Sequence, residues 1–216
     1  MKNLQKMGGI AALYAGAAYV VGILGFLLVV GWPDDPVQQV AVIVDNQVTQ
    51  HILYVIVYQV WAFFLVVLTL ALYERLNADS PAIMQIAKAI GMIWATVVIA
   101  SGMIFNIGMD NVVNLYATDP DQATTVWLAI SSVTTGIGGG NEILGGLWML
   151  LISWVALQAR GLPKALSYLG IVVGLAGIIS ALPGLGEVGL IFGLIQIVWF
   201  VWLGIVMLRK SPSAAV

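Results

Sequence analysis

The chain has 216 residues, of which 61% are hydrophobic and only 8% are Asp, Glu, Lys or Arg. A soluble domain carries about a quarter charged residues on its surface, so this composition excludes a soluble globular protein. The chain has no cysteine and one histidine, which excludes disulfides, thiolate chemistry and any metal or haem site that needs two histidines of one chain. The net charge of −2 excludes a basic nucleic-acid-binding surface.

Six predominantly apolar runs follow one another along the chain. Each is long enough to cross the roughly 30 Å of hydrocarbon in a bilayer. They are residues 8–30, 48–73, 82–107, 138–157, 163–182 and 188–208. The short links between them carry Pro, Gly, Asp and Asn, which favour turns. We therefore predict an all-α fold, with residues 1–216 forming a single bundle of six transmembrane helices.

Two further segments, residues 36–47 and 121–135, predict short amphipathic helices on the outer face. In the first, the apolar positions at helical spacing are Val37, Val40, Ala41 and Val44. In the second they are Val126, Trp127, Ile130 and Val133, and Asp119 or Asp121 can cap the helix. After it, residues 136–140 contain four glycines in five positions, which predicts a break before the next span.

The charges predict the orientation of the spans. With a cytoplasmic N-terminus, all basic residues lie on one side: Lys2, Lys6, Arg75, Lys88, Arg160, Lys164, Arg209 and Lys210. The opposite links carry Asp34, Asp35, Asp45, Asp110, Asp119, Asp121 and Glu187, with no basic residue among them. Since positive charge near span ends is retained in the cytoplasm, we expect a multi-pass protein of the cell membrane with both termini cytoplasmic.

Small residues and aromatic residues predict how the helices pack and where they meet the bilayer surface. Gly170 and Gly174 are spaced four apart, as are Gly189 and Gly193, which lets helix backbones approach closely in lipid and favours packing within the chain. Three aromatic residues suit a belt at the outer interface: Trp32, Tyr116 and Trp127.

The segment 142–180 combines Gly146-Leu147-Trp148 in one span, the turn Arg160-Gly161-Leu162-Pro163, and glycine-rich positions in the next span. In these features it resembles a bacterial and archaeal family of small multi-helix membrane proteins, catalogued as a domain of unknown function. The chain departs from that pattern in the turn, where Ala159 precedes Arg160 and family members carry Ser before Gly. The resemblance implies a membrane bundle but no activity, cofactor or catalytic residue.

Polar side chains inside the predicted spans are the candidate functional residues, since such groups are costly in lipid. Glu142 follows the glycine-rich break, with Asn141 before it; the others are His51, Asn106, Gln59 and Gln196. Brought together, they would line an outward-facing polar pocket. Each also has a structural interpretation: Glu142 as a helix-start residue, His51 as an interfacial one, and the glutamines as hydrogen-bonding partners between helices.

Three classes of function remain open. The first is a binding or accessory protein that holds a lipid or small hydrophobic molecule, or contacts a membrane-protein partner or a second copy of itself. The second is a small transporter or channel that uses Glu142 as an intramembrane carboxylate. The third is an intramembrane enzyme with an acid–base pair of His51 and Glu142. We favour the first, because it requires the fewest chemical groups, and we expect no cofactor and no nucleic acid.

Overall fold

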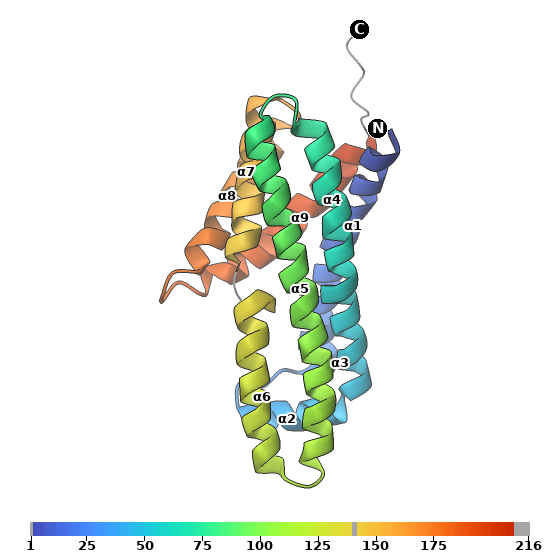
Figure 1. Cartoon of the computed structure of the whole chain (residues 1–216), viewed down its shortest axis with the longest axis vertical. Helices are drawn as coiled ribbons and strands as arrows, with labels where there is room; N and C mark the ends of the chain where they lie inside the picture. Colours follow the sequence, from blue (N-terminus) through green and yellow to red (C-terminus); the bar gives the residue numbers. More distant parts are fainter. Residues whose placement is uncertain (1, 140–141, 210–216) are drawn as a thin grey trace. The chain divides into compact units, whose positions relative to one another are not determined.

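A computed structural model describes residues 2–139 and 142–209 of the chain (Figure 1). Their secondary structure is helical throughout, with no strand in these two ranges. The all-α fold class predicted from the sequence is therefore confirmed. By the distribution of its contacts the chain divides into two compact units, each of which gathers segments distant in the sequence.

Unit 1 comprises Met1–Ala17, Ala62–Ala95 and Asn141–Val216. Besides parts of α1 (Lys2–Leu24), α4 (Trp61–Leu76) and α5 (Pro81–Tyr116), it contains three helices of the C-terminal half: α7 (Ile143–Gln158), α8 (Lys164–Ser180) and α9 (Val188–Arg209). Successive helices among these three pack on one another. Inside the unit, the buried rings of Trp148 and Trp199 meet edge to face, with centroids 6.0 Å apart.

Glycines allow α7 and α8 to touch along their backbones. A Cβ built on Gly146 would lie 2.7 Å from the carbonyl oxygen of Gly174, and one built on Gly174 would lie 2.8 Å from that of Gly146. No larger side chain fits at either position, so Gly174 packs within the chain as predicted. Gly193 of α9 differs, because a Cβ there would meet no atom within 4 Å.

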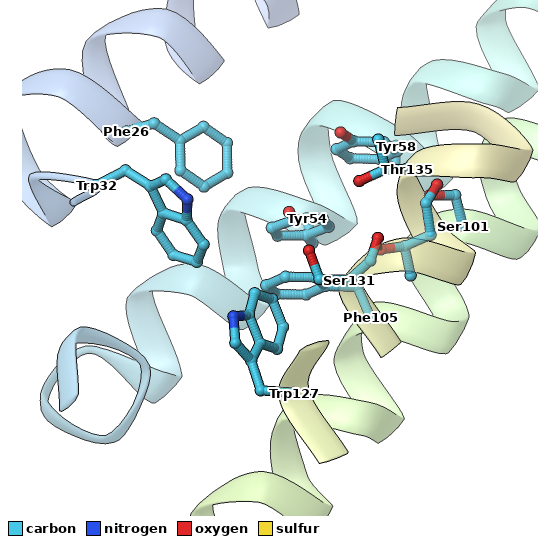
Figure 2. A pocket seen from close by; sticks show the side chains of 10 residues that line it. Phe26, Trp32, Tyr54, Tyr58, Ser101, Phe105, Trp127, Ser131 and Thr135 are labelled. Carbon is cyan, nitrogen blue, oxygen red and sulfur yellow. Dashed lines mark hydrogen bonds between the residues drawn. The ribbon is translucent and has the colours of Figure 1, made fainter. Parts of the chain in front are cut away.

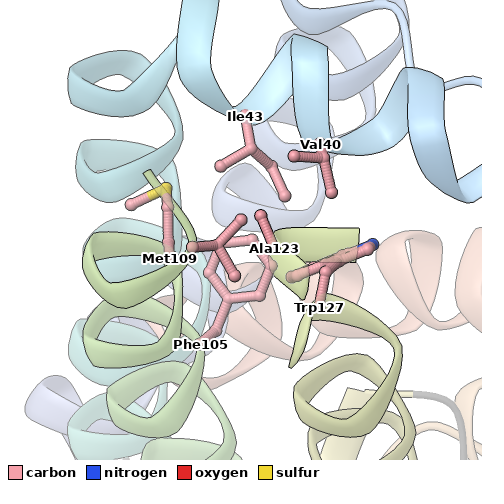
Figure 3. Close-up of a cluster of buried hydrophobic side chains, with 7 residues drawn as sticks. Val40, Ile43, Phe105, Met109, Ala123 and Trp127 are labelled. Atoms are coloured by element: carbon pink, nitrogen blue, oxygen red, sulfur yellow. The ribbon is translucent and has the colours of Figure 1, made fainter. Parts of the chain in front are cut away.

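Unit 2 comprises Ala18–Trp61 and Thr96–Gly140. Its helices are α2 (Pro36–Asp45), α3 (Gln47–Tyr54), α6 (Pro120–Thr134) and the second half of α5. The core of the unit joins α2, α5 and α6 (Figure 3), and its buried members are Val40, Ile43, Phe105, Met109, Val112, Ala123 and Trp127. In α2 the buried residues are therefore Val40 and Ile43, whereas Val37 of the predicted stripe is exposed.

The starts of α2 and α6 follow from local side chains. Asp35 accepts a hydrogen bond from the backbone N–H of Val37 at 3.1 Å, and Asp119 accepts one from that of Gln122 at 3.0 Å. Each aspartate thus satisfies a donor that the first helical turn leaves open, and a proline follows it at the first helical position. Of the two residues proposed to cap α6, Asp119 is the one that does so.

In the part of the chain that the structure describes, five stretches are long and apolar enough to cross a membrane: Asn3–Leu28, Gln47–Leu76, Pro81–Tyr116, Pro120–Gln158 and Val188–Arg209. The chain is therefore a membrane protein. The remaining apolar helix, α8, has 17 residues. Three helices differ in extent from the prediction. α1 begins at Lys2 instead of near residue 8, and α5 continues to Tyr116 instead of ending near residue 107, because no proline interrupts it. α7 begins at Ile143, after the glycine-rich segment.

Candidate functional site

A pocket of about 280 Å³ lies within unit 2 (Figure 2). We call it the aromatic pocket. Its lining residues are Phe26, Trp32, Tyr54, Tyr58, Ser101, Phe105, Trp127, Ser131, Thr134 and Thr135. Six of these are aromatic and four carry an aliphatic hydroxyl, and none carries a charge. In Figure 2, Phe26 and Trp32 lie on one side and Tyr58, Ser101 and Thr135 on the other.

Three π-helical segments contribute to this pocket: η1 (Gly25–Val30), η2 (Val55–Val60) and η3 (Thr135–Gly139). They supply Phe26, Tyr58 and Thr135, respectively. At the end of η1 the N–H of Gly31 donates to the carbonyl of Phe26, five residues earlier, at 2.9 Å. A π turn inserts an extra residue into a helix and rotates the following side chains, and such turns occur frequently at functional sites. Within the described residues, all π-helical segments lie in unit 2.

The wall formed by α3, η2 and α5 is a stack of rings. Tyr54 lies flat on Phe105, with centroids 3.4 Å apart and planes at 5°. Tyr54 also stacks on Tyr58, one helical turn later, at 4.8 Å and 8°. Phe26 meets the same Tyr54 edge to face at 5.6 Å. The rings of this wall are therefore held in place by one another.

Trp127 is held in place from two sides. Its exposed fraction is 2%, and its indole N–H donates to Oε1 of Gln39, on α2, at 2.7 Å. The Nε2 group of Gln39 donates in turn to the carbonyl of Pro33 at 2.9 Å. Trp32, next to Pro33, packs edge to face on Trp127 with centroids 5.8 Å apart. The link between η1 and α2 is thereby tied to α6 beside the pocket.

The hydroxyl groups come from α5, α6 and η3. Oγ of Ser101 donates to the carbonyl of Thr134 at 2.9 Å, and Oγ1 of Thr134 donates to the carbonyl of Ser131 at 3.1 Å. Because these hydroxyls donate their protons to the backbone, their oxygens remain available as acceptors. An uncharged molecule with a flat ring and a hydrogen-bond donor at its edge matches this lining.

The structure assigns three residues proposed from the sequence to unit 2, and none of them lines the aromatic pocket. His51 lies in the last turn of α3 and is partly buried. Gln59 lies in η2, and its side chain packs where α5 passes at Gly102. Asn106 of α5 is 4% exposed, and neither atom of its amide group has a hydrogen-bond partner among the described residues.

Glu142 and Gln196 belong to unit 1. Glu142 precedes the first residue of α7, but its side chain makes no capping hydrogen bond. Its Cγ lies 3.8 Å from the position of a Cβ built on Gly189, near Ser180. Gln196 of α9 is fully buried, and both its amide atoms are without partners in the described part of the chain. Asn141 lies outside the described residues.

The sequence interpretation missed the aromatic residues of this pocket. It assigned Trp127 to a belt at the outer interface, whereas Trp127 is buried in the core of unit 2, because α2 covers it. One signal was present in the sequence: Tyr54 and Tyr58 are four residues apart and so share a helix face. The signal is weak, since aromatic pairs at this spacing are common in helical cores.

The model of a family described as "Domain of unknown function (DUF4386)" matches residues 10–210. The chain therefore belongs to this family, and the resemblance noted over residues 142–180 extends over most of its length. No curated protein matches the chain. No solved structure matches it either.

Proposed function

We propose that this member of the DUF4386 family is a binding protein that holds an uncharged molecule with a planar ring in the aromatic pocket. One observation carries the proposal: each of the three π-helical segments of unit 2 contributes a residue to the same pocket. A π turn interrupts the regular hydrogen-bonding pattern of an α-helix and is therefore rare. Such turns are found mostly where they shape a functional site. Their convergence on one pocket is more than packing alone requires.

The lining suggests the chemical class of the ligand. The lining rings of Phe26, Trp32 and Tyr58 are not fully buried and favour an aromatic ring. The oxygens of Ser101 and Thr134 favour a hydroxyl or amine hydrogen at the edge of that ring. The absence of charged side chains from the lining residues favours a neutral, lipid-soluble compound such as a phenol. A volume of about 280 Å³ is at the lower end of small-molecule sites and suits a single ring system with short substituents.

The first test is native mass spectrometry of the full-length protein released from mild detergent. Ser131→Leu places an aliphatic side chain in the pocket, while Ser132→Leu is its control, because the neighbouring Ser132 is exposed and does not line the pocket. We expect a discrete small-molecule mass on the wild type and on Ser132→Leu that is lost from Ser131→Leu. A bare chain in all three, or equal retention in both variants, would reject the proposal. A multiple of the chain mass would report a homo-oligomer.

For the arrangement in the membrane, we propose six spans with both termini cytoplasmic in the cell membrane, so that the aromatic pocket lies towards the outside. The one-sided distribution of Lys and Arg supports this, as does the apolar character of α8, which at 17 residues is about 25 Å long.

The chain has no cysteine, so single cysteines can be placed freely to test this arrangement. Asp35→Cys and Gly186→Cys should react with an impermeant thiol reagent applied to intact cells, and Ala78→Cys only after permeabilisation. Protection of Gly186→Cys alone would mean that α8 does not cross.

Coupled transport through Glu142 is the second candidate, favoured by the interruption of α-helix in η3 just before it. Transporters place ion sites at such breaks. In proteoliposomes with an entrapped pH-sensitive dye, we expect Glu142→Gln to abolish proton flux and Glu187→Gln, an exposed carboxylate, to retain it. No flux above protein-free liposomes in the wild type would remove this candidate.

A further inference from the structure

A second pocket, within unit 1, is lined by positively charged side chains, whereas the lining of the aromatic pocket is uncharged. It has a volume of about 450 Å³, and we call it the arginine pocket. Its lining residues are Arg75, Arg160, Gly161, Leu162, Pro163, Trp202, Ile205, Val206 and Arg209. Three of them are arginines and none is acidic. It shares no residue with the aromatic pocket, so a ligand bound here is independent of the ring-binding function proposed for unit 2.

Arg75 lies in the last turn of α4, and only some of the N–H donors of its guanidinium group have acceptors within the protein. Its Nε and Nη2 groups both donate to the carbonyl of Gly161, at 3.0 and 2.9 Å. Its Nη1 group is buried and has no hydrogen-bond partner among the described residues. A buried donor of a charged group that lacks a partner is costly. Arg75 therefore needs an acceptor, and the pocket that it lines can supply one.

The other two arginines come from the ends of α7 and α9. Arg160 follows α7 with a φ of 52°, a left-handed conformation that is uncommon for a residue with a side chain, and it is exposed. Arg209 is the last residue of α9 and is also exposed. The N-terminus of α8 begins beside the pocket at Pro163, which adds the positive end of a helix dipole. The positive charges of the two guanidinium groups and the N-terminus of α8 favour an anion.

The remaining wall is apolar. Leu162 is buried, whereas Trp202 and Ile205 of α9 are each 37% exposed. These two lie three residues apart on one face of α9, with Val206 beside them. A guanidinium cluster next to an exposed apolar strip fits a molecule with an anionic head and a hydrocarbon tail. A free inorganic anion would use only the arginines.

We propose that the arginine pocket binds the phosphate headgroup of an anionic phospholipid, with an acyl chain along Trp202 and Ile205. Arginine forks match phosphate oxygens in pairs, and basic pockets between membrane helices bind anionic headgroups. All three arginines lie on the side of the chain assigned to the cytoplasm, so the lipid belongs to the inner leaflet. Arg75 would give its unpartnered Nη1 group to the phosphate, and Arg160 and Arg209 would close over it.

The test is native mass spectrometry of the full-length protein titrated in detergent with dioleoyl phosphatidylglycerol or, separately, dioleoyl phosphatidylcholine. The double variant Arg160→Gln/Arg209→Gln leaves the hydrogen bonds from Arg75 to Gly161 intact. Lys6→Gln/Lys164→Gln is the matched control, because it removes two exposed positive charges from residues that do not line the pocket. We expect the wild type and the control to retain the anionic lipid preferentially, and the arginine variant to lose at least about tenfold in its affinity for that lipid.

Two results would overturn the proposal. Equal loss in the arginine variant and the lysine control would mean that surface charge alone attracts the lipid. Displacement of phosphatidylglycerol by an excess of inorganic phosphate, with phosphate adducts in its place, would mean that the site takes the free anion and that the apolar strip has no role. Retention of the lipid against excess phosphate, with the arginine-specific loss, would support it.

Discussion

The ring of Tyr54 lies flat on the ring of Phe105, with centroids 3.4 Å apart and planes inclined by 5°. This contact joins α3 to α5, and both rings face the aromatic pocket. The ring of Phe105 also meets the indole of Trp127 edge to face, with centroids 5.5 Å apart. Phe105 therefore links the stacked rings of the pocket wall to the buried indole of α6. The pocket and the core of unit 2 therefore share two side chains, Phe105 and Trp127, and loss of either should affect both.

Phe105→Leu should lower the free energy of unfolding by about 1–2 kcal/mol, because it removes two ring contacts and leaves a cavity. For a protein of this size that corresponds to a drop of roughly 2–8 °C in the unfolding midpoint, measured by thermal unfolding in detergent. Phe63→Leu is the control, since Phe63 is 65% exposed and should change little. Equal midpoints for the two variants would show that the ring stack does not stabilise unit 2.

Gly146→Ala should destabilise the contact between α7 and α8. The added Cβ would lie 2.7 Å from two backbone atoms, the carbonyl oxygen of Gly174 and the nitrogen of Ile178, and backbone cannot move aside as a flexible side chain can. We expect a loss of about 1–3 kcal/mol. Gly193→Ala meets no atom within 4 Å and should be neutral or stabilising by up to about 1 kcal/mol, because alanine favours helix. Thermal unfolding in detergent compares the two variants. A lower midpoint for Gly193→Ala than for Gly146→Ala would contradict the packing of α7 on α8.

Gln196→Met tests the cost of a buried amide without partners. Both amide atoms of Gln196 are unpartnered in the described part of the chain, and a thioether of similar shape removes that penalty of about 1–3 kcal/mol. We expect a higher unfolding midpoint. Gln39→Met is the contrasting variant, because the Gln39 amide accepts from Trp127 and donates to Pro33, and it should lower the midpoint. A clear loss of stability in Gln196→Met would instead indicate that Gln196 holds a water or a ligand.

Asp119→Ala should weaken the start of α6 by about 1 kcal/mol, because the N–H of Gln122 loses its acceptor. Hydrogen exchange of the first turn of α6, followed by mass spectrometry, measures the effect directly. Asp119→Asn keeps a side-chain oxygen in the same place and should retain most of the protection. If both variants exchange like the wild type, the cap contributes nothing to α6.

Several features of the protein follow from the sequence alone. The apolar composition required a membrane protein, since 8% charged residues cannot cover a water-facing surface. Local chemistry limited the cap of α6 to Asp119 or Asp121 and predicted an interruption within residues 136–140, because these features depend on neighbours within a few residues. The one-sided positive charge likewise predicts an orientation without any knowledge of packing.

Only the tertiary structure decided which aromatic residues form a pocket and which polar residues are left without partners. In lipid, side chains that face the bilayer and side chains that face the protein are both apolar, so hydrophobic periodicity does not distinguish them. Trp127 shows the consequence: the same residue suits a membrane interface or a buried core, and the cover provided by α2 decides between them. The π turns are a second reason why the sequence did not predict the pocket. Each π turn shifts the helical register by one residue, so a count based on 3.6 residues per turn misplaces every side chain beyond it.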